Sequence, residues 1–408
     1  MVKLNPHFAK LSTYFLYPEI EKKVAQIKAK QPGKAMINLS LSDITKPLSP
    51  TLLAALCSAS QEMGDRNTFR GYGPSQGYAF LREAISYGEY RHLGISSDEI
   101  FVSNGAKCDL SHIQEIFDID NRVAICDPAN PVYLDTTILA GRTHEANEQG
   151  EYGGVQTIPC LEENNFIPHP PSAPCDLIYL CSPNNPTGTA MDRRSMRQWV
   201  DYALDNQSVI IFDGAYEAYI SSDDCPHSIY EIQGAKEVAI EVRSFSKTAG
   251  FTGLRCSYTV VPKELRANLN GSDVSLHSLW RRRHDTKFGG VPYPIQKCAA
   301  AFYSPEGNRE VKEIIYMYQE RARFLVEGLR KIGLTAYGGR DAPYIWCKAP
   351  CSMTSWQFFD DLLTRLQIIS VPGPGFGRRG EGFVRLSAFA EPSQLAEGLL
   401  RLKNLFKI

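Results

Sequence analysis

Lys247 is the residue of this chain whose surroundings are best suited to covalent chemistry. It ends the stretch Ser244-Phe245-Ser246-Lys247, and Arg255 follows eight residues further on. A lysine amine on a rigid element can form a Schiff base with the aldehyde of pyridoxal 5′-phosphate (PLP). The hydroxyls of Ser244 and Ser246 and the guanidinium of Arg255 suit a phosphate dianion, because charged donors bind it strongly. Since Ser-x-Ser-Lys also occurs on ordinary surface loops, the prediction of a PLP site depends on the rest of the chain.

A carboxylate and a phenol follow another apolar stretch. Asp213 comes directly after residues 209–212, and Tyr216 stands three positions later. A carboxylate beside the pyridine nitrogen of PLP keeps the ring protonated, which makes the ring an electron sink. We therefore expect Asp213 at the ring nitrogen and Tyr216 in a hydrogen bond to the ring 3′-oxygen. The alternative is a simple Asp-Gly turn, which is the more common meaning of such a pair.

Four further segments could complete the site. Asn185, in a proline-rich turn after residues 177–181, could donate to the same 3′-oxygen. Ala106 and Lys107 follow a glycine turn at a helix start, where backbone amides bind phosphate. Tyr133 could stack on the cofactor ring, and Arg385 could hold a substrate α-carboxylate with two parallel hydrogen bonds. Each residue also has an alternative role in a turn, in packing or on the surface, so the prediction depends on the whole set.

The apolar runs before these residues predict the elements that position them. Buried strands are expected at residues 100–103, 123–126, 177–181, 209–212 and 238–242. Their alternation with amphipathic stretches predicts an α/β fold with a mainly parallel sheet flanked by helices. Ligands bind beyond the carboxyl ends of such strands, so the polar residues there should meet in one crevice. A helix at 311–332 and strands at 342–346 and 383–387 predict a smaller α+β domain. We expect a large PLP-binding domain at 46–292 and a small domain formed by 1–45 and 293–408.

Composition narrows the class of protein. The 408 residues carry a formal net charge of −1, and no basic run exceeds Arg281-Arg282-Arg283, so a nucleic-acid partner is not expected. The eleven cysteines are spread singly and include no CxxC pair, which indicates a reducing compartment and no metal site. The N-terminal segment lacks the apolar core of a signal peptide, and no apolar run could span a bilayer. We expect a cytoplasmic protein without a membrane partner.

Over essentially its full length the chain resembles the LL-diaminopimelate aminotransferases, which are fold-type I PLP-dependent transferases. The resemblance implies a homodimer with shared active sites, in which Tyr72 reaches the cofactor phosphate of the partner subunit, and a small amino acid as substrate. It also supports the roles expected above for the cofactor and α-carboxylate residues. The motifs that carry it are Gly71-Tyr72-Gly73-Pro74, Gly105-Ala106-Lys107-Cys108-Asp109, Ser182 to Gly188, Ser244 to Arg255, Tyr337-Gly338-Gly339 and Gly382 to Phe389.

The chain departs from this family at the residues that read the substrate side chain. Ser75 stands where the family has a glutamate, Gly289 where it has an asparagine, and Phe15 where it has a tyrosine. The family's usual Gly-Ile-Gly-Asp is Ser40-Leu41-Ser42-Asp43 here. The resemblance implies that the glutamate, asparagine and tyrosine bind the distal end of diaminopimelate. Each buried partner lost costs about 1–3 kcal/mol, so the pattern indicates a changed substrate.

The hypothesis placed first is a PLP enzyme for another free basic L-amino acid, with Asp43 near the side-chain cation. The reaction expected first is dehydrative cyclisation of a hydroxyarginine to a cyclic guanidino amino acid of the enduracididine or capreomycidine type. Transamination of a related substrate is a second possibility. The alternative is LL-diaminopimelate:2-oxoglutarate aminotransferase of lysine biosynthesis. A PLP-sensing regulator would need an added DNA-binding module, and the enzyme-like pattern occupies nearly the whole chain.

Overall fold

The computed structural model describes residues 2–11, 16–148 and 150–406. Seven of its strands form one sheet with the order β2-β8-β7-β6-β5-β3-β4. The strands of this sheet are β2 (Ile100–Ser103), β3 (Val123–Asp127), β4 (Val155–Pro159), β5 (Leu177–Cys181), β6 (Val209–Asp213), β7 (Ala239–Ser244) and β8 (Ser257–Val260). Only β8 runs antiparallel to its neighbours, so the sheet is mainly parallel and the α/β prediction is confirmed.

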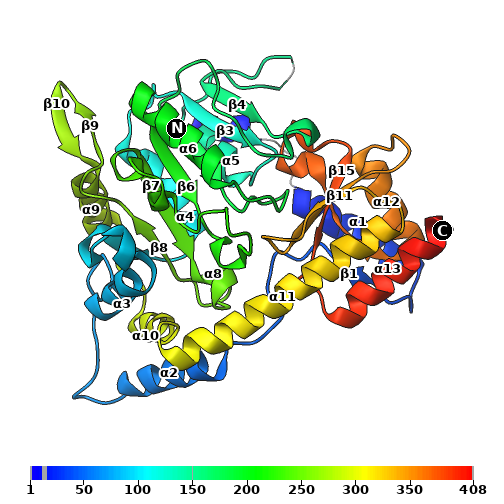
Figure 1. Cartoon of the computed structure of the whole chain (residues 1–408), viewed down its shortest axis with the longest axis horizontal. Helices are drawn as coiled ribbons and strands as arrows, with labels where there is room; N and C mark the ends of the chain where they lie inside the picture. The colour runs from blue at the N-terminus through cyan, green and yellow to red at the C-terminus, as the bar shows by residue number, and fades with distance from the viewer. Residues whose placement is uncertain (1, 12–15, 149, 407–408) are drawn as a thin grey trace.

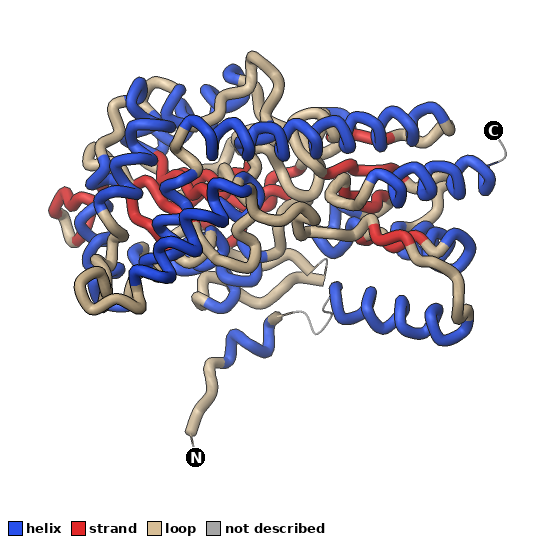
Figure 2. The backbone as a smooth tube through the Cα atoms, turned by 90° about the horizontal axis from the view of Figure 1, so that it is seen from below, coloured by secondary structure: helices blue, strands red, loops and turns tan. Residues whose placement is uncertain are grey.

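Helices cover both faces of this sheet, so that the strands form a middle layer (Figure 2). The strands β2, β6 and β7 are buried along their whole length, as expected where both faces are covered. The helices are α1 (Leu16–Lys30), α2 (Pro50–Glu62), α3 (Ala79–Ile85), α4 (Ala106–His112), α5 (Val132–Leu139), α6 (Arg193–Asn206), α7 (Ala235–Val238), α8 (Phe245–Thr248), α9 (Leu276–Lys287), α10 (Tyr293–Ala301), α11 (Pro305–Lys331), α12 (Ser355–Leu366) and α13 (Pro392–Phe406).

A smaller antiparallel sheet with the order β11-β12-β15-β14 lies at the other end of the molecule (Figure 1). Its strands are β11 (Ala336–Gly338), β12 (Tyr344–Lys348), β14 (Val371–Pro372) and β15 (Phe383–Ser387). The helices α11, α12 and α13 pack on it around a second apolar core. Helix α11 begins at a sequence-coded start, since the Ser304 hydroxyl accepts from the Gly307 amide and Pro305 follows. It reaches from α2 to α13 and joins the two parts (Figure 1).

The N-terminal segment belongs with the smaller sheet in space, although it is far from it in sequence. Strand β1 (Ile37–Asn38) pairs in parallel with β13 (Ile368–Ile369). Helix α1 packs on α12, and Lys23 forms an ion pair with Asp360 at 2.9 Å.

A last pair of strands, β9 (Arg266–Leu269) and β10 (Ser272–Ser275), forms an exposed hairpin. The boundaries of the two domains remain a prediction. In the described residues, no helix is both long and apolar enough to cross a membrane.

The carboxyl ends of β2, β3, β5, β6 and β7 point to the same edge of the large sheet, because β8 is antiparallel to both β2 and β7. Asp213 ends β6 and Ser244 ends β7, and the turn that contains Asn185 follows β5. The expected crevice residues are therefore brought to one edge, as the strand pattern predicted.

Candidate active site

Lys247 lies on the four-residue helix α8, which begins directly where β7 ends. The Ser244 hydroxyl accepts from the amide of Ser246 at 3.1 Å and caps this helix. The Lys247 amine donates to the carbonyl oxygen of Ser42, and the hydroxyl of Tyr219 donates to the Lys247 carbonyl at 3.0 Å. Burial lowers the pKa of the amine to about 8, with Asp43 opposing this shift through its negative charge. A large share of the amine is therefore neutral, and hence nucleophilic, near pH 8.

Asp213 is buried and firmly held. Its carboxylate accepts from the Tyr133 hydroxyl at 2.6 Å and from the Ala215 amide at 3.0 Å. Burial raises the pKa of Asp213, and these two hydrogen bonds act against that rise. The ring of Tyr133 stacks on Tyr179 with centroids 5.1 Å apart. The contact of Tyr133 with Asp213 was not expected from the sequence, and its stacking on a cofactor stays a prediction.

Arg385 is fully buried, and its partners come from three segments of the chain. Its guanidinium donates to the side-chain oxygen of Asn185 at 2.7 Å, to the Ser42 hydroxyl at 2.7 Å and to the Ser40 carbonyl at 3.2 Å. The guanidinium lies 4.4 Å from the ring centroid of Tyr344. No carboxylate forms an ion pair with Arg385 in the described part of the chain. A buried cation without an anion is costly, so the site is suited to a carboxylate ligand.

The phenol of Tyr216 faces the same place. Its hydroxyl lies 2.8 Å from that of Tyr344, and both residues are buried. Burial raises the pKa of Tyr216 well above its usual value, so the phenol keeps its proton and can act as a hydrogen-bond donor. Sequence reasoning found Tyr216 but missed Tyr344, because an aromatic residue inside an apolar strand is typical of core packing.

Arg255 lies beside the turn before α4. The Arg255 guanidinium donates to the Ser246 hydroxyl at 3.3 Å and to the Thr252 carbonyl at 3.1 Å. Gly105 has a φ of 98°, and a Cβ on it would lie 2.0 Å from Nη2 of Arg255. Ala106 and Lys107 begin the helix directly after Gly105. The turn and the guanidinium thus approach each other as closely as glycine allows, which fits a phosphate group held between backbone amides and arginine.

The turn before α4 is held from below by a buried carboxylate. Asp109 accepts from the hydroxyls of Ser103 and Thr259, each at 2.5 Å. Ser103 ends β2 and Thr259 lies on β8, so Asp109 ties the first turn of α4 to two strands. Burial raises the pKa of Asp109 to about 6. The backbone of the Gly105 turn is therefore fixed before any ligand arrives.

Tyr72, Ser75 and Gly289 lie apart from this cluster. Tyr72 is fully exposed, with a relative accessibility of 101%. Ser75, on the same loop, donates from its hydroxyl to the carboxylate of Asp285 at 2.5 Å. Gly289 is exposed, and the neighbouring Gly290 lies against the backbone of Pro74. The loop and the end of α9 thus form one exposed surface.

Besides Tyr344, three polar residues of the site were not predicted as such from the sequence, and one predicted residue lies outside the described part of the chain. Asp285 beside Ser75, and Ser42 and Tyr17 beside Arg385, are new. Phe15 lies outside the described residues. Asp43 is exposed and close enough to Lys247 to raise the pKa of its amine. Tyr17 stands two positions after Phe15, but nothing in that spacing links it to Arg385.

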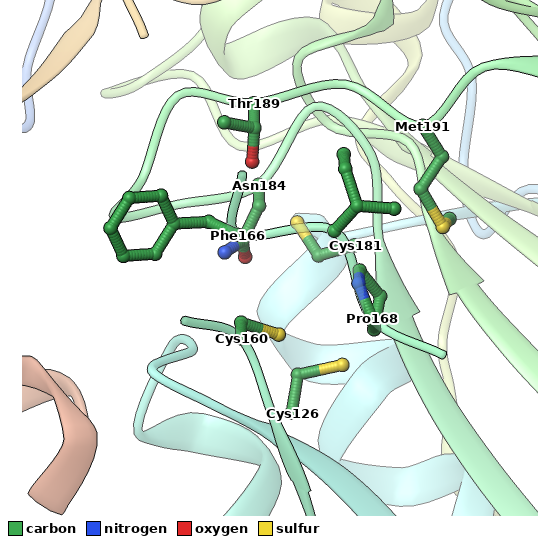
Figure 3. A pocket seen from close by; sticks show the side chains of 9 residues that line it. Cys126, Cys160, Phe166, Pro168, Cys181, Asn184, Thr189 and Met191 are labelled. Carbon is green, nitrogen blue, oxygen red and sulfur yellow. The ribbon is translucent and has the colours of Figure 1, made fainter. Parts of the chain in front are cut away.

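Three thiols line a small cavity behind the turn that carries Asn185. Figure 3 shows Cys126, Cys160 and Cys181 around it, with Asn184 at one side. A hydrogen bond with Cys160 and burial raise the pKa of Cys126 well above its usual value, and burial does the same for Cys181. Protonated, buried thiols are unreactive. This cavity therefore contributes packing behind the active site.

Comparisons with known proteins agree with this geometry. The family model described as "aminotransferase class I and II" matches residues 34–402. The structure is similar to an LL-diaminopimelate aminotransferase from Chlamydomonas reinhardtii, with 41% identity, 99% of both chains covered and a TM-score of 0.93. It is also similar to substrate-bound BacF from Bacillus subtilis, with 26% identity, 99% and 98% coverage and a TM-score of 0.83. An aspartate aminotransferase from Thermotoga maritima shares the fold at 22% identity, with 99% and 100% coverage and a TM-score of 0.83.

Proposed function

Because the chain belongs to the class I and II aminotransferases, which use PLP, we propose that it transfers the amino group of LL-diaminopimelate to 2-oxoglutarate. One observation carries the proposal of a free α-amino acid as substrate. Lys247 and Arg385 both donate to Ser42, one to its carbonyl oxygen and one to its hydroxyl. The reactive amine and the carboxylate clamp are therefore separated by a single residue. That spacing suits a substrate whose amino and carboxylate groups share one carbon.

The residues at the sheet edge fit PLP. Arg255, the Ala106 and Lys107 amides and the hydroxyls of Ser244 and Ser246 would hold its phosphate. Asp213 would lie at the ring nitrogen, Tyr216 and Asn185 at the ring oxygen, and Tyr133 beside the ring. The close approach of the Gly105 turn to Arg255 supports this fit, because a Cβ would fill the space between them. When bound, PLP supplies an electrophilic aldehyde and a ring that withdraws electrons from the substrate α-carbon.

The chain's own residues would then orient the substrate and move its protons. Arg385 holds the α-carboxylate and thereby directs the α-carbon toward Lys247. With its pKa lowered to about 8, the neutral Lys247 amine can act as a general base that takes the proton from the substrate α-carbon. The protonated amine can then act as a general acid in the next step. Asp213 would accept from the ring nitrogen of PLP and favour a proton there, because Tyr133 and Ala215 hold its carboxylate in place as an acceptor.

The distal ammonium group of diaminopimelate needs a carboxylate partner other than residue 75. In the proposed homodimer, the loop that carries Tyr72 and Ser75 reaches the partner's active site. Ser75 lacks the family's carboxylate, but Asp285 supplies one at 2.5 Å from the Ser75 hydroxyl. We infer that Asp285 meets the distal ammonium group of diaminopimelate across the subunit boundary. Asp43 is a second acid near the cluster, on the side of Lys247.

The order of the two hypotheses drawn from the sequence is thereby reversed. Cyclisation of a hydroxyarginine was expected first because three distal readers had changed. The similarity to an LL-diaminopimelate aminotransferase at 41% identity favours the alternative, and Asp285 offers a compensating carboxylate. For location we propose the cytoplasm, since all eleven cysteines are free thiols.

The test is a comparison of amino donors with 2-oxoglutarate as acceptor, with glutamate measured as product. We expect LL-diaminopimelate to be preferred over lysine, arginine and γ-hydroxyarginine. The variant Asp285→Asn should lower kcat/KM for diaminopimelate by about tenfold or more, because a hydrogen bond to a charged group is lost. Its kcat/KM for glutamate in the reverse half-reaction should not change. The matched control is Asp273→Asn, on the exposed hairpin, where Asp273 pairs with Arg266. Equal loss for both donors would contradict the role of Asp285, and absence of glutamate from diaminopimelate would contradict the substrate.

A further inference from the structure

We propose that Tyr17 and Ser42 form the second half of the carboxylate site at Arg385, and that the Tyr17 hydroxyl sets how tightly a substrate carboxylate is held. This inference deepens the proposed function and rests on it, since it concerns the same substrate group. Tyr17 lies at the start of α1 and Arg385 lies on β15, so the two residues are far apart in sequence and meet only in the folded structure.

The first support is the incomplete environment of Arg385. The residue is fully buried, and its Nε has no hydrogen-bond partner among the described residues. Three neutral groups accept from the guanidinium, those of Asn185, Ser40 and Ser42. Two aromatic rings, Tyr344 and Phe376, lie 4.4 and 4.9 Å from it. The positive charge is thus enclosed by neutral groups and needs an anion from outside.

The second support is the position of the Tyr17 hydroxyl. Burial alone would raise the pKa of Tyr17, but the charge of Arg385 and hydrogen bonds with Ser42 and Arg385 lower it, with a smaller effect of Lys107. The phenol therefore lies in the positive field of the clamp. The ring remains 46% exposed, so Tyr17 stands where a ligand would enter from solvent. A phenol in such a field is a strong donor toward an anion.

The placement of Tyr17 is fixed by its neighbour Leu16. A Cβ on Gly375 would lie 2.1 Å from Cδ2 of Leu16, so only glycine admits this leucine. Gly375 directly precedes Phe376, one of the rings against Arg385. The ion pair of Lys23 with Asp360 holds the same helix further along. These two contacts hold helix α1 against the small domain that carries Arg385. The Tyr17 hydroxyl is therefore held in a defined position beside the guanidinium.

The chemistry follows from the number of hydrogen bonds that a carboxylate accepts. Its two oxygens offer about four acceptor positions, and one arginine fills two of them. The hydroxyls of Tyr17 and Ser42 lie beside the guanidinium and can fill the others. The Ser42 hydroxyl accepts from Arg385 and forms a hydrogen bond with Tyr17, so the two hydroxyls can turn together toward an incoming carboxylate.

The experiment measures binding of maleate, a dicarboxylate without an amino group, to the PLP-loaded enzyme by its effect on the cofactor spectrum. Tyr17→Phe keeps the ring and removes only the hydroxyl, and it should weaken maleate binding about tenfold, as expected for one hydrogen bond to a charged group. Ser42→Ala should have a similar effect, and the pair together a larger one. In turnover, Tyr17→Phe should raise KM for the amino donor with kcat nearly unchanged. The control is Tyr316→Phe, on α11, whose ring is 59% exposed and near Arg323.

Maleate affinity within twofold of wild type in Tyr17→Phe would overturn the proposal, as would failure of the wild-type enzyme to bind maleate. A merely structural role would instead lower the melting temperature and leave the affinity of the folded enzyme unchanged. Maleate binding does not depend on which amino acid is the donor. A normal Tyr17 effect with no turnover of diaminopimelate would therefore contradict only the proposed substrate.

Discussion

Replacing Gly105 with alanine should weaken the binding of the PLP phosphate by displacing the Arg255 guanidinium. Gly105 has a φ of 98°, and the new Cβ would lie 2.0 Å from Nη2 and 2.7 Å from Cζ of Arg255. Because Asp109 fixes the turn from below, the guanidinium has to move instead of the backbone. Arg255 itself has a φ of 60°, which is rare for a residue with a side chain, so its direction is constrained by the backbone. The guanidinium should therefore leave the pocket.

The size of the effect can be worked out from these contacts. A left-handed backbone costs a residue other than glycine about 1–2 kcal/mol, which lowers the stability of the whole protein. Loss of the hydrogen bonds of Arg255 to a phosphate costs a further 1.5–3 kcal/mol or so, and this part appears only when PLP binds. PLP affinity should therefore fall by about ten- to a hundredfold.

The assay is titration of the apoenzyme with PLP, followed by absorbance, together with thermal unfolding of the apoenzyme. The control is Gly253→Ala, in the same loop as Arg255, where a Cβ would have no heavy atom within 4 Å. We expect the control to bind PLP as the wild type does. Unchanged PLP affinity in Gly105→Ala would refute the reasoning, because it would mean that Arg255 is not a phosphate ligand.

Two further predictions concern pH. Because burial lowers the pKa of Lys247 to about 8, the neutral amine predominates above that pH. The rate at which the apoenzyme attaches PLP should therefore rise with pH with a midpoint near 8, whereas an unperturbed lysine would have its midpoint near 10.4. Removal of the negative charge in Asp43→Asn should move this midpoint to lower pH, and an unchanged midpoint would argue against their proximity. Tyr133→Phe should move the acid-side loss of activity to higher pH, because the Tyr133 hydrogen bond lowers the pKa of Asp213. A pH–rate profile identical to that of the wild type would show that Asp213 does not control that limb.

The large sheet was predictable from sequence where strands are fully buried. The runs that became β2, β3, β5, β6 and β7 are continuous and apolar, and the polar residues after them reached one edge as expected. Strands β4 and β8 were missed for physical reasons. Strand β4 lies at the edge, half-buried, and carries polar residues. Strand β8 contains Ser257 and Thr259, whose hydroxyls serve buried hydrogen bonds with Ser103 and Asp109, so its sequence does not look apolar.

Several residues proposed to hold the cofactor could be chosen from the sequence because they end a strand or closely follow one, as Asp213 and Ser244 do. The residues that tune them could not, because their partners are distant in sequence. Tyr133 bonds to Asp213 and Tyr17 approaches Arg385 only after the chain has folded. In the sequence Asp285 follows the basic run 281–283 and resembles part of an exposed helix face. Only its contact with Ser75 in the folded chain places its carboxylate near the position where the family has a glutamate.

The most direct test of the central claim is a half-reaction in a spectrophotometer, with PLP-loaded enzyme, no 2-oxo acid and mass spectrometry of the products. The account predicts that LL-diaminopimelate converts the cofactor to its amine form and leaves as the corresponding 2-oxo acid. Lysine, arginine and γ-hydroxyarginine should do so far more slowly. The account would be contradicted if diaminopimelate left the spectrum unchanged while hydroxyarginine lost water and the cofactor returned as PLP.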